Sequence, residues 1–329
     1  MTRVWSADTA LPSFEATTIE LEPEDDGELV ATLVRRRAEG HGSRAILYVH
    51  GFIDYFFQEH VADAFNAQGW DFYAIDLRRY GRSLRAGNRP HYCRDLSEYY
   101  QELTAAIDII KLEDEHETLV VLGHSMGGLV TALYADNGER CEEISGLVLN
   151  SPFLRFSLTK LQNLRMPLGA LIGKVFPFLA DKDSVSARYV ESISSAYDGE
   201  WDFDARWKPA TGTPTYYGWV RAIRRGHARV SRGLSIHCPV LVLHSSHSMF
   251  PAARGDERHK NHDLILDIAH IRELGPTLGS NVTVRRIEGG VHDLFLSAEP
   301  VRNKALSVVF GWLVNSLGER KVVIREFRT

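Results

Sequence analysis

The clearest chemical signal in the chain is the segment GHSMGG at 123–128. It follows TLVVL, an apolar run typical of a buried strand, and precedes an apolar pattern at helical spacing that ends at Gly138. The order G-x-S-x-G between a strand and a helix is typical of a nucleophilic serine on a sharp turn, because side chains at the glycine positions would collide with nearby backbone. The sequence therefore predicts Ser125 as a nucleophile. The alternative is a turn that only caps a helix.

The elements expected around this turn alternate between strands and helices. Before the turn we expect a hairpin, a strand, a helix, a strand and a helix, over 14–38, 44–52, 59–70, 71–77 and 99–115. After it we expect a strand over 144–153 and then, further along, a strand, a helix, a strand and a helix over 238–246, 263–274, 281–290 and 301–319. This alternation predicts an α/β fold with a mostly parallel central sheet flanked by helices. A mainly helical insertion over 153–236 would divide this core into 1–152 and 237–329.

With these motifs in this order, the chain resembles the α/β-hydrolase superfamily, and within it the capped branch of monoacylglycerol lipases, lysophospholipases and serine aminopeptidase-like proteins. The resemblance covers nearly the whole chain. It rests on four features: His50-Gly51-Phe52 after an early strand, Asp76 with Gly81-Arg82-Ser83 after the next strand, the GHSMGG turn, and a late histidine. It implies an α/β-hydrolase fold in which 153–236 forms a cap. It also implies an oxyanion hole made by the backbone N–H groups of Phe52 and Met126.

A serine hydroxyl is a weak nucleophile at neutral pH and needs a base, for which the resemblance implies a histidine after the last strand. His292, in the segment GGVHD at 289–293, lies there and is the predicted base. A histidine in an ordinary surface loop is the alternative. Asp293, its neighbour, is expected to be a local polar residue.

The carboxylate that would orient this histidine departs from the family pattern. The family has an aspartate a few residues after the strand that here reads PVLVLHSS, but His247 and Ser248 occupy that place. Asp263 begins the segment DLILD, which has the expected pattern at a later position, and it is the predicted acid. Asp263 could instead be a helix N-cap. Three other carboxylates remain candidates for the acid: Asp256, Glu257 and Asp267.

Histidines are frequent in the same stretch, where the spacing HxxH occurs twice, and they could suggest a metal site: His244, His247, His259, His262 and His270. The spacing has no accompanying glutamate or cysteine ligands, and a serine hydrolase needs no metal. We therefore expect no metal and no cofactor, and interpret this stretch as a polar edge of the site.

The insertion is expected to determine the substrate. Its aromatic side chains, among them Phe176, Trp207 and Trp219, could line a tunnel for an acyl chain or form the core of the insertion itself. Its acidic residues could bind a free amino group of a peptide-like substrate: Glu191, Glu200 and Asp202.

Together these features predict hydrolysis of carboxylic esters through an acyl-enzyme, as in monoacylglycerol lipases or lysophospholipases, on a small-molecule substrate with a medium or long acyl group. An aminopeptidase or amidase is the first alternative. A non-catalytic relative that binds a ligand is the second, and the displaced acid is the feature that favours it.

The composition agrees with a globular enzyme and excludes other classes. The chain has 329 residues, of which 44% are hydrophobic and 25% charged, which excludes a disordered or fibrous protein. A net charge of −5 does not indicate a nucleic-acid binder. Three cysteines at wide spacing do not suggest a disulfide scaffold, and no signal peptide or span is recognisable, so a cytoplasmic location is expected. Contact with a lipid surface remains open.

Overall fold

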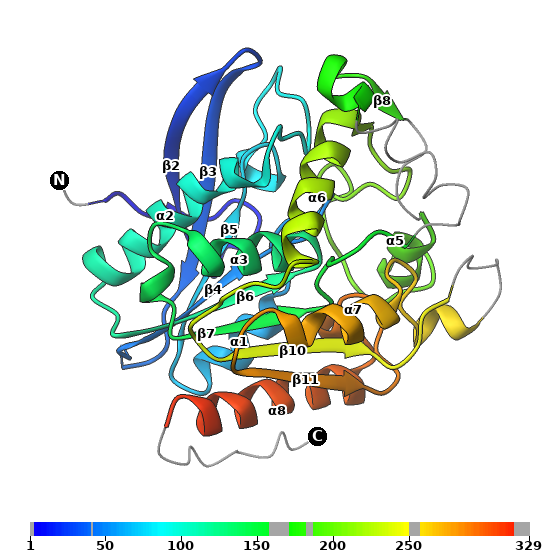
Figure 1. Cartoon of the computed structure of the whole chain (residues 1–329). Coiled ribbons are helices and arrows are strands. Elements are labelled where there is room, and N and C mark those ends of the chain that lie inside the picture. The colour runs from blue at the N-terminus through cyan, green and yellow to red at the C-terminus, as the bar shows by residue number, and fades with distance from the viewer. Residues whose placement is uncertain (1–2, 41, 158–170, 182–186, 250–256, 319–329) are drawn as a thin grey trace.

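The computed structural model describes residues 3–40, 42–157, 171–181, 187–249 and 257–318, and its centre is a nine-stranded sheet (Figure 1). The strand order is β1-β2-β3-β5-β4-β6-β7-β10-β11, in which β1, β2 and β3 are antiparallel and the six strands from β5 to β11 are parallel to one another. The strands span Ser6–Ala7 (β1), Glu15–Glu24 (β2), Gly27–Arg36 (β3), Arg44–Val49 (β4), Asp71–Asp76 (β5), Thr118–His124 (β6), Gly146–Asn150 (β7), Val240–Ser245 (β10) and Val282–Ile287 (β11). The predicted α/β architecture with a mostly parallel sheet is confirmed.

Helices cover both faces of this sheet. They span Glu59–Asn66 (α1), Tyr100–Asp108 (α2), Met126–Asn137 (α3), Ile268–Leu274 (α7) and Glu299–Ser316 (α8), and a π-helical turn over Ile109–Glu113 extends α2. One apolar core joins the sheet to α2, α3 and α7, and a second joins its other face to α1 and α8 (Figure 1). Strands such as β4 and β6 are therefore buried on both faces, which explains their continuous apolar sequence.

Short 3-10 helices occupy several of the connections. They span Gly81–Ser83, Leu96–Tyr99, Cys141–Glu143, Glu257–Lys260, Gly275–Thr277 and Leu294–Leu296.

The connection between β7 and β10, residues 151–239, is the longest between neighbouring strands of the sheet. Its described part contains helices α5 (Ala187–Ile193) and α6 (Tyr217–Val230) and a small antiparallel sheet of β8 (Ala180–Asp181) and β9 (Thr215–Tyr216), which the sequence does not predict. The apolar side of α6, with Trp219 and Ile223, packs into the core beside α3, whereas its arginines lie on the other side. Figure 1 shows α6 leading up to β8 at the top of the molecule.

The helix predicted over 263–274 is wrong in its first residues, because α7 begins only at Ile268. The backbone N–H of Asp263 donates to the carbonyl of His247, and the carbonyl of Asp263 accepts from the N–H of Met249. These strand-like contacts occupy the backbone groups that a helix would use. Asp267 is the N-cap of α7, with its side chain accepting from the N–H of Ala269 at 2.9 Å.

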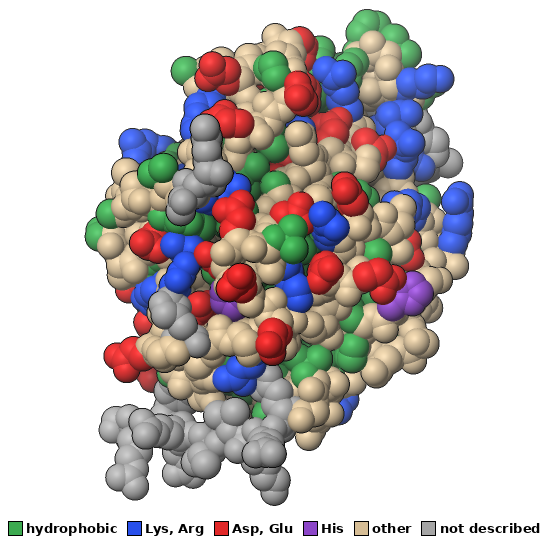
Figure 2. Space-filling model, turned by 90° about the vertical axis from the view of Figure 1, so that its left-hand side faces the viewer, with side chains coloured by type: hydrophobic (Ala, Val, Ile, Leu, Met, Phe, Trp, Pro, Cys, Tyr) green, Lys and Arg blue, Asp and Glu red, His purple; other side chains and the backbone are tan. Residues whose placement is uncertain are grey.

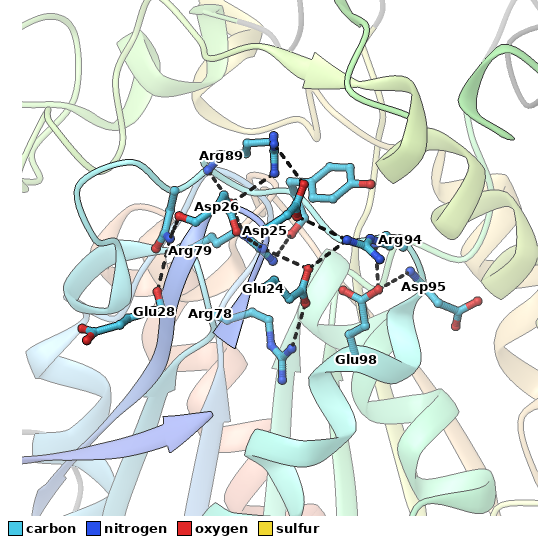
Figure 3. A network of polar contacts seen from close by, with 12 residues as sticks. Glu24, Asp25, Asp26, Glu28, Arg78, Arg79, Arg89, Arg94, Asp95 and Glu98 are labelled. Atoms are coloured by element: carbon cyan, nitrogen blue, oxygen red, sulfur yellow. Dashed lines mark hydrogen bonds and ion pairs between the residues drawn. The ribbon is translucent and has the colours of Figure 1, made fainter. Parts of the chain in front are cut away.

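Ion pairs form between the β2–β3 hairpin and the loops that follow β5. The carboxylates of Glu24, Asp25 and Asp26 are contacted by Arg79, Arg89 and Arg94 (Figure 3). The pair between Arg79 and Asp26 is buried, with 2.6 Å between Nη2 and Oδ1. Acidic and basic side chains are intermixed over the face shown in Figure 2.

Several described histidines are buried within the fold without a carboxylate in contact, and His91 and His227 are two of them. His91 lies 2.9 Å from Thr213 Oγ1 through Nδ1, and His227 donates from Nε2 to the carbonyl of Phe153 at 2.8 Å. Burial, with a smaller contribution from His50, lowers the pKa of His91 to about 3. Burial also lowers the pKa of His227 to about 4.

We expect acid to destabilise the protein through these two histidines. Above about pH 6.5 both are neutral in the folded and unfolded states, so their contribution is complete; as the pH falls below that value, only the unfolded chain binds protons. Each histidine then lowers the free energy of unfolding by about 1.4 kcal/mol per pH unit. Urea unfolding of the native protein and of His227→Gln between about pH 7.5 and about pH 5 measures this, and a variant that retains the full pH slope would contradict it.

Candidate active site

Ser125 lies on a sharp turn between β6 and α3. Its backbone has a φ of 53°, in the left-handed region that residues other than glycine seldom adopt. A side chain at Gly123 would overlap Thr131 and the carbonyl of Gly127, and one at Gly127 would overlap the carbonyl of His50. The two glycines therefore allow the turn to approach the helix and the end of β4, as G-x-S-x-G predicts.

The structure brings together the three side chains predicted as a triad. Ser125 Oγ lies 2.9 Å from His292 Nε2, and His292 Nδ1 lies 3.0 Å from Asp263 Oδ2. All three residues are buried, and Asp263 has no exposed surface. Because the carboxylate accepts from Nδ1–H, Nε2 of the neutral ring is left as an acceptor for the serine hydroxyl.

Asp263 is held in place by its own turn. Its Oδ1 accepts from the N–H groups of Ile265 and Leu266, both at 2.8 Å, which leaves Oδ2 for His292. Of the other candidate acids, Glu257 pairs with Lys260 and Asp267 caps α7. Asp256 lies outside the described residues.

The two residues whose backbone N–H groups are implied as an oxyanion hole both adjoin the Ser125 region: Met126 follows Ser125, and Phe52 follows Gly51. Met126 is the first residue of α3, so its N–H has no acceptor within the helix. Gly51 is so close that a Cβ on it would lie 3.2 Å from Ser125 Cβ. The ring of Phe52 stacks on Trp219 at 4.0 Å, which holds this loop against α6.

His50 fixes the peptide that carries the Phe52 N–H. Its Nε2 accepts from the N–H of Leu77 at 3.0 Å, so Nδ1 is the protonated nitrogen and donates to the carbonyl of Gly51 at 2.8 Å. In a trans peptide the N–H points opposite to the C=O, so this bond directs the Phe52 N–H away from His50. Burial lowers the pKa of His50, which favours the neutral ring that this arrangement needs.

A cavity of about 290 Å³ adjoins Ser125 and His292. Its lining is mostly apolar and comes from the loop after β4, from the β7–β10 connection and from the turn after Asp263: examples are Phe52, Phe153, Phe156, Tyr189, Trp219 and Leu266. Trp219 belongs to the core and also lines the cavity, whereas Phe176 is exposed and Trp207 packs on the ring of Tyr55.

A buried ion pair in this cavity is not predicted by the sequence analysis. Lys208 Nζ lies 2.6 Å from Asp54 Oδ1, and both side chains are almost fully buried among the lining residues. Within the part of the chain that the structure describes, neither the Asp54 carboxylate nor the Lys208 ammonium group makes another hydrogen bond. The position of Asp54, two residues after Phe52, could have been noticed, but nothing local in the sequence indicates its partner 154 residues away.

The carboxylates suggested for binding an amino group do not line this cavity. Glu191 pairs with Arg188, and Glu200 pairs with Arg302. Asp202 is likewise absent from the lining.

The histidine-rich stretch does not assemble three metal ligands among the described residues. The rings of His247 and His262 are 5.1 Å apart, and His244 is buried with Nδ1 bonded to the carbonyl of Ser245. The one described group of three close carboxylate or histidine ligands is 24–26, whose carboxylates contact the arginines described above.

The fold and this geometry agree with comparisons to known proteins. Residues 40–299, more than half of the chain, match the sequence model of the family described as serine aminopeptidase, S33. The chain belongs to this α/β-hydrolase family. The matched segment contains Ser125, Asp263 and His292.

Relatives with lipase names are among the similar proteins. A monoacylglycerol lipase from Mycolicibacterium smegmatis is 29% identical over 282 residues, which cover 83% of this chain and 88% of the relative. A soluble variant of a monoglyceride lipase from Saccharomyces cerevisiae superposes with a TM-score of 0.67 at 17% identity, covering 91% of this chain and 96% of the other. A monoacylglycerol lipase structure from Paleococcus ferrophilus has a TM-score of 0.63 at 21% identity, covering 86% and 99%.

The resemblance to the monoacylglycerol lipase-like branch of the α/β-hydrolases is thus confirmed, and the family and its relatives indicate that the chain is a hydrolase. Among the residues described, no helix is long and apolar enough to cross a membrane.

Proposed function

We propose that this α/β-hydrolase cleaves carboxylic esters through an acyl-enzyme formed on Ser125. The observation that carries the proposal is the continuous chain of contacts from Ser125 Oγ through His292 to Asp263, at the wall of an apolar cavity. A non-catalytic relative would be favoured by an acid out of reach of the histidine. Asp263 lies within hydrogen-bond distance, despite its displaced position in the sequence.

In the proposed mechanism, Ser125 attacks the ester carbonyl while His292 Nε2 accepts its proton. Asp263 stabilises the imidazolium that forms, and the N–H groups of Phe52 and Met126 bind the developing oxyanion. His292 then protonates the leaving alcohol. Water repeats the sequence on the acyl-enzyme, releasing the fatty acid and restoring Ser125.

We propose a monoacylglycerol or a similar ester of a polar alcohol as the substrate. The apolar lining of the cavity suits an acyl chain, and the Asp54–Lys208 pair offers a donor and an acceptor that could bind hydroxyl groups. A substrate with a free amino group needs an unpaired carboxylate, but Asp54 is already neutralised by Lys208. This observation favours an ester hydrolase over an aminopeptidase.

We also propose that 153–236 acts as a cap, between core segments 1–152 and 237–329. Support comes from the number of lining residues that this segment contributes, from Phe153 to Val220. The choice of acyl chain would then depend on the β7–β10 connection rather than on the sheet.

Hydrolysis of a nitrophenyl ester series from acetate to laurate, with a monoacylglycerol and an aminoacyl anilide alongside, tests the proposal. We expect turnover of the esters with an optimum beyond acetate, together with glycerol release from the monoacylglycerol. Labelling by a serine-directed phosphonate should occur at Ser125. Cleavage of the anilide alone would favour the aminopeptidase, and absence of both turnover and labelling would favour a ligand-binding protein.

Contact with a lipid surface is a further part of the proposal, supported by an exposed apolar patch in the β7–β10 connection. Four large apolar side chains between 171 and 179 are more than half exposed: Leu171, Val175, Phe176 and Leu179. This segment lies at the top of the molecule in Figure 1, beside the upper end of α6. Such a patch is suited to partial burial among lipid head groups.

We expect the variant Val175→Ser/Phe176→Ser to bind neutral phosphatidylcholine vesicles about 10-fold more weakly than the native protein, because each buried apolar side chain contributes about 1.5–3 kcal/mol when fully transferred. Cosedimentation with vesicles measures this. Leu112→Ser is a matched control, since Leu112 is 65% exposed at the end of the π-helical turn after α2. Equal binding of the double variant and the native protein would contradict the proposal.

A further inference from the structure

Asp293, the residue after the predicted base, is a buried carboxylate that the proposed mechanism does not use. It is 1% exposed, and neither an arginine nor a lysine pairs with it among the described residues. Its Oδ1 accepts from Asn150 Nδ2 at 2.7 Å and from the N–H of Phe295 at 3.1 Å, and its Oδ2 accepts from Gln58 Nε2 at 3.0 Å. A buried charge satisfied by three neutral donors needs an explanation, because an isolated buried carboxylate is costly.

Burial alone would raise the pKa of Asp293. The nearby ring of His124 and the hydrogen bonds from Asn150 and Phe295 outweigh that effect, so the pKa lies below its ordinary value. The side chain is therefore an anion at neutral pH, which strengthens each bond that it accepts.

Asn150 connects this carboxylate to the nucleophile. It is the last residue of β7 and is fully buried. Its carbonyl accepts from the backbone N–H of Ser125 at 3.0 Å and lies 3.1 Å from Nδ1 of His124. Its side chain donates to Asp293 and accepts from the N–H of Leu294 at 3.3 Å. One residue of the rigid sheet thus contacts both the serine turn and the histidine loop.

The loop that carries His292 and Asp293 is also contacted by Gln58 and Tyr189. Gln58, in the loop before α1, donates to Asp293 and to Tyr48 Oη, while its own carbonyl oxygen accepts from the N–H of Phe57. Tyr189, on α5, accepts from the backbone N–H of Asp293 at 3.2 Å. The Tyr189 ring also lies edge-on to the His292 ring, with 5.3 Å between centroids.

We infer that Asp293 is a positioning residue that, through Asn150, fixes His292 relative to Ser125. The inference rests on the proposed function only for the role of His292 as the base. The physical reason is that proton transfer needs the Oγ and Nε2 atoms at hydrogen-bond distance, and a displacement of about 1 Å can cost about 10²-fold in rate. A histidine on a loop is less well fixed than one on a strand, so anchoring its neighbour to the end of β7 supplies that precision.

Asp293→Asn tests the inference because it removes the negative charge and because its amide nitrogen must face a donor, either Asn150 Nδ2 or Gln58 Nε2. We expect kcat on a nitrophenyl ester to fall about 10²-fold with KM nearly unchanged. The exchanged pair Asn150→Asp/Asp293→Asn restores one donor and one acceptor, and its kcat should return to within about 10-fold of the native value. Each kcat is calculated from the concentration of active sites, which is measured by titration with the phosphonate. Unfolded protein therefore does not lower the measured kcat.

Asp71→Asn is the matched control for a buried carboxylate with a structural role. Asp71 begins β5, at the opposite end of the sheet, where it accepts from the N–H of Ala38 and contacts His116. This variant should unfold at a lower urea concentration and keep its native kcat. If Asp293→Asn behaves in the same way, the positioning role is overturned.

A second measurement does not depend on turnover. The proton shared by His292 Nδ1 and Asp263 should give a far-downfield proton NMR signal in the native protein and in Asp71→Asn, and this signal should broaden or disappear in Asp293→Asn. An unchanged signal would overturn the inference even if no ester were cleaved. If Asp293→Asn does not fold, Gln58→Met is the second variant, because it removes one donor to Asp293. We expect its kcat to fall about 10-fold. An unchanged kcat in this variant would overturn the inference.

Discussion

Replacing Ser125 by alanine is expected to abolish ester hydrolysis, with a fall in kcat on the order of 10⁶. The variant lacks the only atom placed to form the acyl-enzyme in the proposed mechanism, while Phe52 and Met126 keep their backbone N–H groups. The fold should persist, because alanine is smaller than serine and the Ser125 side chain makes no capping hydrogen bond at the N-terminus of α3. Ester turnover and phosphonate labelling measure the loss.

A nearby serine supplies the control for this experiment. Ser151 is fully buried at the end of β7, and its Oγ has no hydrogen-bond partner among the described residues. Ser151→Ala should therefore retain kcat within about twofold. If Ser125→Ala kept a substantial share of the native rate while remaining unlabelled by the phosphonate, the acyl-enzyme proposal would fail.

Replacing Asp263 by asparagine is expected to lower kcat by about 10⁴. The asparagine oxygen can still accept from Ile265 and Leu266, so the turn is preserved and the amide nitrogen faces His292 Nδ1. An amide nitrogen cannot accept from Nδ1–H, and the ring is driven to the tautomer with its proton on Nε2. In that tautomer His292 cannot accept the proton of Ser125.

Asp267→Asn is the matched control, because Asp267 lies four positions later and caps α7. Asparagine is as good an N-cap as aspartate, so both stability and kcat should remain close to native. Measurement of kcat for the two variants on one ester therefore separates the candidate acids. Similar losses in both, or a larger loss in Asp267→Asn, would remove Asp263 from the mechanism.

Local patterns in the sequence were enough for most strands of the central sheet and for two of the three predicted triad residues. Strand β6, the glycines at 123 and 127 and helix α3 are contiguous, so their geometry follows from nearest-neighbour sterics. His292 could be predicted because a histidine after the last parallel strand must lie at the carboxyl edge of the sheet, where Ser125 also lies. The first inference uses local sequence alone, whereas the second also uses the family resemblance.

Only the tertiary structure determined which side chains from distant parts of the sequence lie in contact. Asp263 follows β10 by 18 residues, and it meets His292 because its backbone pairs with His247 and Met249 instead of starting the predicted helix. The Asp54–Lys208 pair and the Asn150–Asp293 bond join residues more than 140 positions apart. Periodicity carries no information about such partners, because the energy of a buried polar group depends on which donor the fold brings to it.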